Sequence, residues 1–235
     1  ESIKDAGDPV ELAAKYSNEG ADELVFLDIT ASNEQRETIK ELVRKVASVI
    51  NIPFTVGGGV KSIDDARNIL LNGADKVGVN TSAIKIPTLI TELMTLFGRQ
   101  CVVVAIDAKR NFEIKENVNV FSESGKEFWF EVFIYGGKQG TGIDVINWAK
   151  EAEKLGAGEI LLTSIDADGT KNGYDVLLTK SIVSNSSIPV IASGGCGKPD
   201  DMVDIFEKSN VDAALAASDG VLIRVYMHCM CQTSH

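Results

Sequence analysis

The sequence predicts an α/β protein, a (β/α)₈ barrel built from two half-barrel repeats, and three observations support this. Short apolar runs alternate with amphipathic helical patterns along the chain, which is typical of βαβ units and a parallel sheet. The chain has 235 residues, close to the roughly 250 residues of a single barrel of this kind. Blocks of the first half recur in the second half at a constant offset, which indicates an internal repeat. We therefore expect one domain over residues 1–235.

The expected strands are continuous apolar runs, as strands covered on both faces of a parallel sheet should be. These runs are Leu24–Leu27, Phe54–Val56, Lys76–Val79, Val102–Ile106, Ile160–Thr163, Val190–Ala192 and Ala213–Ala217. The helical patterns between them are Pro9–Asn18, Glu34–Val49, Ser62–Asn72, Ala83–Phe97, Ile143–Leu155 and Lys198–Lys208. Alternating apolar residues and a Ser124-Gly125 turn predict that the polar segment Asn111–Phe133 is a hairpin or long excursion after the fifth barrel strand.

Three blocks carry the repeat, and all lie in one register. The matched pairs, each 136 residues apart, are Glu19–Glu23 with Leu155–Glu159, Ile52–Gly59 with Ile188–Gly195, and Asp64-Asp65 with Asp200-Asp201. They divide the chain into half-barrels at about residues 1–98 and 99–218. Residues 219–235 form an atypical tail of β-like composition.

The repeat also predicts which barrel strand is absent. The run Val102–Ile106 has a first-half counterpart only upstream of Glu1, so we expect the first barrel strand to be lacking. Seven strands cannot close a barrel that needs eight. The unpaired sheet edges would make the chain marginally stable or prone to aggregation.

Charge and composition narrow the function. The formal net charge of −11 argues against nucleic acid or an anionic membrane as a partner, although backbone N–H groups can still hold a small anion. No apolar run approaches the roughly 20 residues of a membrane span, and no signal peptide opens the sequence. A cytoplasmic protein with reduced thiols is expected. The four cysteines do not pair with histidines as metal ligands do, and His228 and His235 lie outside the repeated core, so we expect no metal, triad or cofactor; the cysteines are Cys101, Cys196, Cys229 and Cys231.

Glycines follow a predicted strand at equivalent places in both halves. Gly57–Gly59 and Gly194-Gly195 each lie between a strand and a helix, where glycine lets the backbone approach an anion. The alternative is a tight-turn glycine, but the duplication favours phosphate binding. Asn80-Thr81 and Ala217-Ser218 end the next strand in each half and can complete such sites. Two sites across the barrel mouth indicate an elongated ligand with a phosphate at each end.

Carboxylates follow the strands at the same face. Asp107 ends the run Val102–Ile106 and should face the active-site mouth; the alternatives are a helix N-cap or a satisfied loop carboxylate. Asp166 and Asp168 follow the sixth strand without the spacing of an EF-hand. We favour one as a general acid or base and the other as a loop cap. Asp28 ends the second strand.

Several segments resemble a known family, and they are Asp5–Pro9, Phe26–Ser32, Val56–Gly59, Val104–Arg110, Leu162–Asp166, Asp168–Lys171 and Ala213–Ser218. From about Asp5 to Ser218 the chain resembles the cyclase subunits of imidazole glycerol phosphate synthase, in histidine biosynthesis. The paralogous isomerase of that pathway shares the half-barrel repeat and both phosphate sites. The segments Asp28–Ser32 and Ala105–Arg110 favour the cyclase.

The resemblance implies a reaction and a partner. A glutamine amidotransferase subunit would supply ammonia, which crosses the barrel to a ribonucleotide bearing two phosphates. Cleavage and cyclisation would give imidazole glycerol phosphate and an aminoimidazole carboxamide ribotide. The family's acid/base aspartates lie on the first strand and after the sixth; Asp168 matches the second, and Asp107 matches an active-site aspartate of the fifth strand. The first has no counterpart, which leaves a non-catalytic phosphate-binding barrel, or the isomerase, as an alternative.

Other roles are implied by the same resemblance. The substrate-binding positions fall on Asp28, Gly59, Asn80, Thr81, Gly169, Gly195, Ala217 and Ser218. Glu23, Lys76 and Glu159 match members of a charged ammonia-channel gate, and Asp75 matches a position at the glutaminase interface. The repeat pairs Glu23 with Glu159 independently. The alternative for these two is a solvated face.

Overall fold

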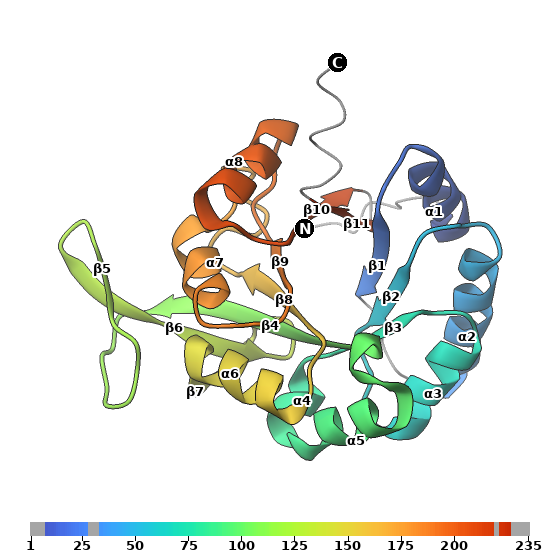
Figure 1. The fold of residues 1–235 in the computed structure, drawn as a ribbon, viewed down its shortest axis with the longest axis horizontal. Helices are drawn as coiled ribbons and strands as arrows, with labels where there is room; N and C mark the ends of the chain where they lie inside the picture. Colours follow the sequence, from blue (N-terminus) through green and yellow to red (C-terminus); the bar gives the residue numbers. More distant parts are fainter. Residues whose placement is uncertain (1–7, 28–32, 219–220, 227–235) are drawn as a thin grey trace.

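The computed structural model of this chain describes residues 8–27, 33–218 and 221–226. Its sheet confirms the predicted alternation of parallel strands and helices, as in a barrel of the TIM type (Figure 1). Neighbouring strands run parallel through seven ring positions. In ring order these are β1 (Glu23–Leu27), β2 (Phe54–Gly57), β3 (Lys76–Val79), β4 (Val102–Asn111), β8 (Glu159–Ser164), β9 (Val190–Ser193) and β10 (Ala213–Ser218).

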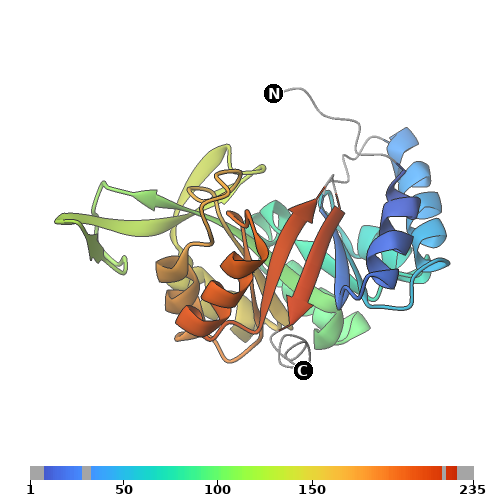
Figure 2. The same ribbon diagram turned by 90° about the horizontal axis from the view of Figure 1, so that it is seen from above.

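An eighth strand from the tail closes the ring. Strand β11 (Val221–Tyr226) runs antiparallel and pairs with both β10 and β1. Figure 2 shows β10 and β11 as adjacent red strands beside the blue β1. Part of the tail, whose composition is β-like, thus forms a strand. The expectation of open sheet edges is wrong for the described residues, because β11 supplies backbone partners to both strands that would otherwise be edges.

Helices cover the outside of the ring (Figure 1). They are α1 (Pro9–Asn18), α2 (Asn33–Ala47), α3 (Ile63–Leu71), α4 (Thr81–Lys85), α5 (Thr88–Phe97), α6 (Val145–Leu155), α7 (Val176–Val183) and α8 (Pro199–Ser209), with a 3₁₀ turn η1 (Arg99–Cys101). The single helix predicted over Ala83–Phe97 is two helices with Pro87 between them, since proline has no N–H to continue the ladder. No described helix is long and apolar enough to cross a membrane.

Asn111–Phe133 contains the predicted hairpin. Strands β5 (Phe121–Glu123) and β6 (Lys126–Ile134) pair antiparallel across Ser124-Gly125. These two turn residues have φ values of 52° and 76°, as a type I′ turn requires. Strand β6 also pairs with β7 (Gln139–Asp144) and with the far end of β4, so the hairpin projects from the ring (Figure 1).

The core has two layers. Side chains that point outward from the strands pack against the helices in one large cluster, which includes Leu24, Val77 and Ile160. A smaller cluster is formed by inward-pointing residues of five ring strands and contains Val25, Val103, Leu161, Ile191, Ala213 and Leu215. The alternation of neighbours such as Leu24 and Val25 between the clusters follows from the two-residue period of a strand. The barrel interior is therefore packed with aliphatic side chains.

Candidate active site

The carboxyl ends of the parallel strands meet at one mouth and bring the predicted polar residues together. Asn80 directly follows β3, and Asp107 lies in β4, where the parallel pairing with β8 overlaps the antiparallel pairing with β6. The loop after β8 carries Asp166 and Asp168. Active sites of barrel enzymes occur at this face.

Asp107 is a partly buried acid of this mouth. Asn80 Nδ2 donates a hydrogen bond to Asp107 Oδ2 at 3.0 Å. Burial raises the pKa of Asp107, and the negative charge of Asp168 raises it further, against the lowering effect of the Asn80 hydrogen bond. Asp107 lies inside a strand, so it is not a helix N-cap. A carboxyl group with a raised pKa suits general acid or base chemistry.

The two acids after β8 have different surroundings. Asp166 Oδ2 accepts a hydrogen bond from the backbone N–H of Arg110 at 2.8 Å and lies 3.5 Å from its Nη1. Asp168 is exposed, its backbone N–H donates to the Ser164 carbonyl at 2.9 Å, and its charge acts on Asp107. Asp166 thus fixes the loop, and Asp168 has the position suited to chemistry.

The first glycine loop is exposed and needs glycine. Gly58 and Gly59 have φ values of 83° and 73°, in the left-handed region that other residues rarely adopt. The nearby Asn80 Oδ1 is a buried acceptor without a partner among the described residues. Thr81 Oγ1 accepts from the Tyr135 N–H at 3.0 Å, which leaves its hydroxyl proton to donate. This side of the mouth therefore combines an accessible backbone with unused polar capacity.

The second glycine pair is buried against the loop after β8. Gly194 and Gly195 have φ values of 89° and 102°. The Gly173 N–H donates to the Gly195 carbonyl at 2.9 Å, and a Cβ on Gly195 would lie 2.1 Å from the Gly173 oxygen. Close packing alone requires glycine here, so the tight-turn interpretation holds beside any anion-binding role. Gly169 has φ 72°, and a Cβ there would meet nothing within 4 Å.

Three predicted positions are less informative. Ala217 and Ser218 end β10 at the mouth, as predicted, but their side chains lie outside the described part. Asp28 is also outside the described residues.

A buried ion cluster lies at the opposite face, where the strands begin. Lys76 Nζ lies 2.9 Å from Glu23 Oε2 and 2.7 Å from Glu159 Oε1. Thr55 Oγ1 donates to Glu23 Oε1 at 2.6 Å. The Glu23 side chain is 0% exposed, and those of Lys76 and Glu159 are 15% and 14% exposed. This burial excludes the solvated-face alternative.

Comparison with known proteins decides the family. Residues 1–219 match the family model described as histidine biosynthesis protein. The chain belongs to this family. It is 76% identical over 218 residues to the imidazole glycerol phosphate synthase subunit HisF of Nitrosopumilus maritimus, an alignment that covers 93% of this chain and 82% of that protein.

Further relatives agree with the family assignment. HisF proteins of Methanocaldococcus jannaschii and Methanococcus vannielii are 60% and 58% identical, over 92% of this chain and 81% and 82% of their own lengths. The resemblance inferred from the motifs is confirmed: the chain is a HisF-type cyclase of histidine biosynthesis.

Asp75, predicted for a partner interface of this family, has a contact within the chain. Its Oδ2 accepts from the Phe54 N–H at 2.8 Å. In the second half, Asp212 Oδ2 accepts from the Val190 N–H at 2.9 Å. The same hydrogen bond thus recurs at the strand start of each half. Asp75 is exposed, and its place at an interface stays a prediction.

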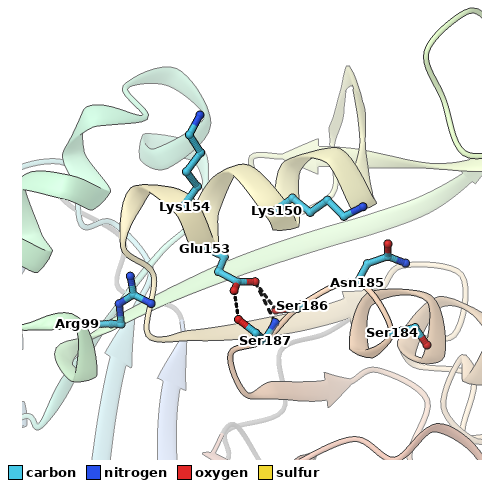
Figure 3. Close-up of a pocket in the computed structure, with 8 residues that line it drawn as sticks. All are labelled: Arg99, Lys150, Glu153, Lys154, Ser184, Asn185, Ser186 and Ser187. Carbon is cyan, nitrogen blue, oxygen red and sulfur yellow. Dashed lines mark hydrogen bonds between the residues drawn. The ribbon is translucent and has the colours of Figure 1, made fainter.

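The pocket in Figure 3 is far from this chemistry. It has a volume of about 630 Å³ and is lined by Arg99, Lys150, Glu153, Lys154, Ser184, Asn185, Ser186 and Ser187. Glu153 accepts hydrogen bonds from Ser187 Oγ, from the Ser187 N–H at 3.0 Å and from Ser186 Oγ at 3.0 Å. The Ser187 hydroxyl contributes most to lowering the pKa of Glu153. The pocket lies among α6 and the segment between α7 and β9, outside the ring.

Two residues of the site were not singled out by sequence reasoning. Arg110 and Asp175 form an ion pair behind the loop of Asp168, with 2.5 Å between Nη1 and Oδ2. A signal for Asp175 exists in the sequence, because it directly precedes the apolar helix α7 and caps it by accepting from the Leu178 N–H at 3.1 Å.

Among the described residues, no cluster of three His, Cys, Asp or Glu side chains could hold a metal ion.

Proposed function

We propose that this chain converts a ribonucleotide bearing two phosphates into imidazole glycerol phosphate and an aminoimidazole carboxamide ribotide, with ammonia from a glutamine amidotransferase subunit. The observation that carries the proposal is the mouth itself. A partly buried Asp107 with a raised pKa lies between an exposed glycine loop and a second glycine loop packed against the segment of Asp168. The relatives are named as subunits of a synthase, which supports a partner chain.

Asp107 and Asp168 share the proton transfers. The raised pKa of Asp107 lets it hold a proton at a pH where an exposed carboxyl group has lost its own. It can therefore donate a proton to a leaving nitrogen or oxygen, while the exposed Asp168 accepts one. Two carboxyl groups in different surroundings are suited to such divided roles.

The two ends of the mouth hold the two phosphates. Gly59, Asn80 and Thr81 form one end, where backbone N–H groups and the unused polar atoms of Asn80 and Thr81 are at hand. Gly169, Gly195, Ala217 and Ser218 form the other, with Asp28 as a further substrate contact. Neutral donors of this kind bind phosphate without a basic patch, which fits a chain of net charge −11.

Ammonia enters at the opposite face. The gate is the ion cluster at the face where the strands begin, formed by Glu23, Lys76 and Glu159. Asp75 lies at the same face, where the partner subunit docks. The interior between gate and mouth is aliphatic, so it offers neutral ammonia a route on which ammonium would lose its solvation.

The two halves arose by duplication. In this repeat the counterpart of β4 is the first barrel strand, and β11 occupies its position in the ring. The hydrogen bond from Leu24 N–H to the Pro53 carbonyl, at 3.0 Å, recurs as Ile160 N–H to Pro189 at 2.9 Å. This supports the repeat beyond the sequence blocks. The free thiols of Cys101 and Cys196 favour the cytoplasm.

The test is turnover with ammonium salt in place of the partner. We expect loss of the bis-phosphate ribonucleotide and formation of both products. No turnover with retained thermal stabilisation by the substrate would favour a non-catalytic phosphate-binding barrel instead. Turnover of the isomerase substrate alone would favour the paralogous isomerase.

A further inference from the structure

The Arg110 side chain is held at the base of the projecting hairpin. Its guanidinium carbon lies 5.1 Å and 5.0 Å from the ring centroids of Phe128 and Phe130, both on β6. These rings are buried, and the Arg110 side chain is 19% exposed. Two aromatic faces hold the charge of a planar guanidinium well. The hairpin thus fixes the direction in which the Arg110 fork points.

The fork points at the loop after β8. Arg110 Nη1 and Nη2 contact the two carboxylate oxygens of Asp175 at 2.5 Å and 3.3 Å. Asp166, in the middle of the loop, accepts from the Arg110 backbone and lies 3.5 Å from its Nη1. Arg110 therefore holds the middle and the end of the segment that carries Asp168.

Asp175 connects Arg110 to the start of the loop after β8 by hydrogen bonds. Its Oδ2 accepts from Ser164 Oγ at 3.1 Å, and Ser164 Oγ in turn accepts from the Ala167 N–H at 3.3 Å. The Asp175 side chain is 5% exposed. Without a cation beside it, this buried carboxylate and the nearby Asp166 would repel one another and draw water into the loop.

We infer that Arg110 is a positioning residue, which holds the loop of Asp168 against the mouth, and that the hairpin of β5 and β6 serves to hold Arg110. The inference rests on the proposed function for its kinetic consequence only. The contacts themselves link Phe128, Arg110, Asp175 and Ser164 in one chain from hairpin to loop.

The variants Arg110→Lys and Arg110→Met test this role. Lysine keeps the charge but cannot form the two parallel bonds or the planar stack. We expect kcat with ammonium to fall roughly 10- to 100-fold in both variants, with a smaller change in KM, because a small misplacement of a reacting group has this effect. Since the charge of Asp168 helps to raise the pKa of Asp107, its displacement should also move the pH profile of kcat to lower pH.

Lys115→Met is the matched control. Lys115 lies 4.8 Å from the Trp129 ring centroid of the same hairpin and donates to the Gly142 carbonyl, away from the loop after β8. It should leave kcat and the pH profile unchanged. Amide hydrogen exchange gives a readout that does not need turnover. Residues 165–174 should exchange faster in both Arg110 variants and at the wild-type rate in Lys115→Met.

The two proposals fail in different ways. A wild-type chain without turnover contradicts the proposed function, while faster exchange at residues 165–174 in the Arg110 variants still supports the clamp. Unchanged exchange in those residues, or an equal effect of Lys115→Met, would overturn the positioning role.

Discussion

At the scale of single residues, the mouth contains one partly buried acid and one exposed acid. Asp107 owes its raised pKa first to burial, and Asp168 is exposed. The sequence indicated acids at the ends of the strands now labelled β4 and β8. It could not rank them, because burial depends on β6 and on Asn80, which reach Asp107 only in three dimensions.

The substitution Asp107→Asn should remove proton transfer and leave the fold intact. We expect kcat to fall about 10²- to 10⁴-fold. An amide side chain can still accept from Asn80 and bears no charge to bury. The pKa of Asp107 is higher in the folded than in the unfolded chain, so protonation of this side chain stabilises the fold. This stabilisation is complete below the unfolded-state pKa and is lost as the pH rises through the folded-state pKa. At neutral pH, Asp107→Asn should therefore be at least as stable as the wild type in urea titrations. A large fall in the unfolding midpoint would contradict this.

Asp168→Asn should behave differently. We expect a fall in kcat of about 10²- to 10⁴-fold, with substrate binding retained in calorimetry. Any residual activity should have a pH profile shifted to lower pH, since the charge that raises the pKa of Asp107 is gone. Asp166→Asn is a useful comparison, because Asp166 faces Arg110 instead. An unchanged rate in Asp168→Asn would remove it from the mechanism.

At the scale of elements, apolar runs predicted where the seven parallel strands lie, but not how far each extends. The run of β4 ends at Ile106, whereas the strand continues to Asn111. Its last residues are mostly polar, so no apolar run marks them as a strand, and they are paired with β6 of the hairpin. Helix α7 was missed for a related reason. It follows the polar stretch 166–175, and its only start signal there is Asp175, which directly precedes the apolar run and caps the helix.

The buried ion cluster belongs to this scale, since it joins the starts of β1, β3 and β8. Lys76→Met should destabilise the chain by about 3–5 kcal/mol, because it leaves buried Glu23 and Glu159 without their shared cation. Urea unfolding at neutral pH measures this. The control Lys150→Met changes an exposed lysine of α6 and should alter stability by no more than about 0.5 kcal/mol. Equal effects of the two variants would contradict a special role for Lys76.

At the scale of the whole molecule, closure depends on β11. The β-like composition of the tail predicts a strand, and the two-residue link from Ser218 to Val221 requires that it pair antiparallel with β10, but its second pairing, with β1, has no local signal. The two strands that β11 joins, β10 and β1, lie far apart in sequence. Their pairing is a property of the closed ring and of no local segment.

Ending the chain after Ser218 should open the ring. Strands β1 and β10 would each lose a row of backbone partners and become free edges. We expect a lower unfolding temperature and concentration-dependent association in size-exclusion chromatography. A chain ended after Tyr226 keeps β11 and is the matched control. Identical behaviour of both truncated chains would show that β11 does not stabilise the ring.

The direction of β11 has a practical consequence for experiments on assembly. The register places Tyr226 opposite Ala213, at the start of β10, and Arg224 opposite Glu23. The chain thus leaves its last described strand beside the ion cluster, on the side proposed for the amidotransferase. An affinity tag or fluorescent fusion placed there would compete with that partner for space. A tag inserted at the Ser124-Gly125 turn, at the tip of the hairpin, would leave that side uncovered.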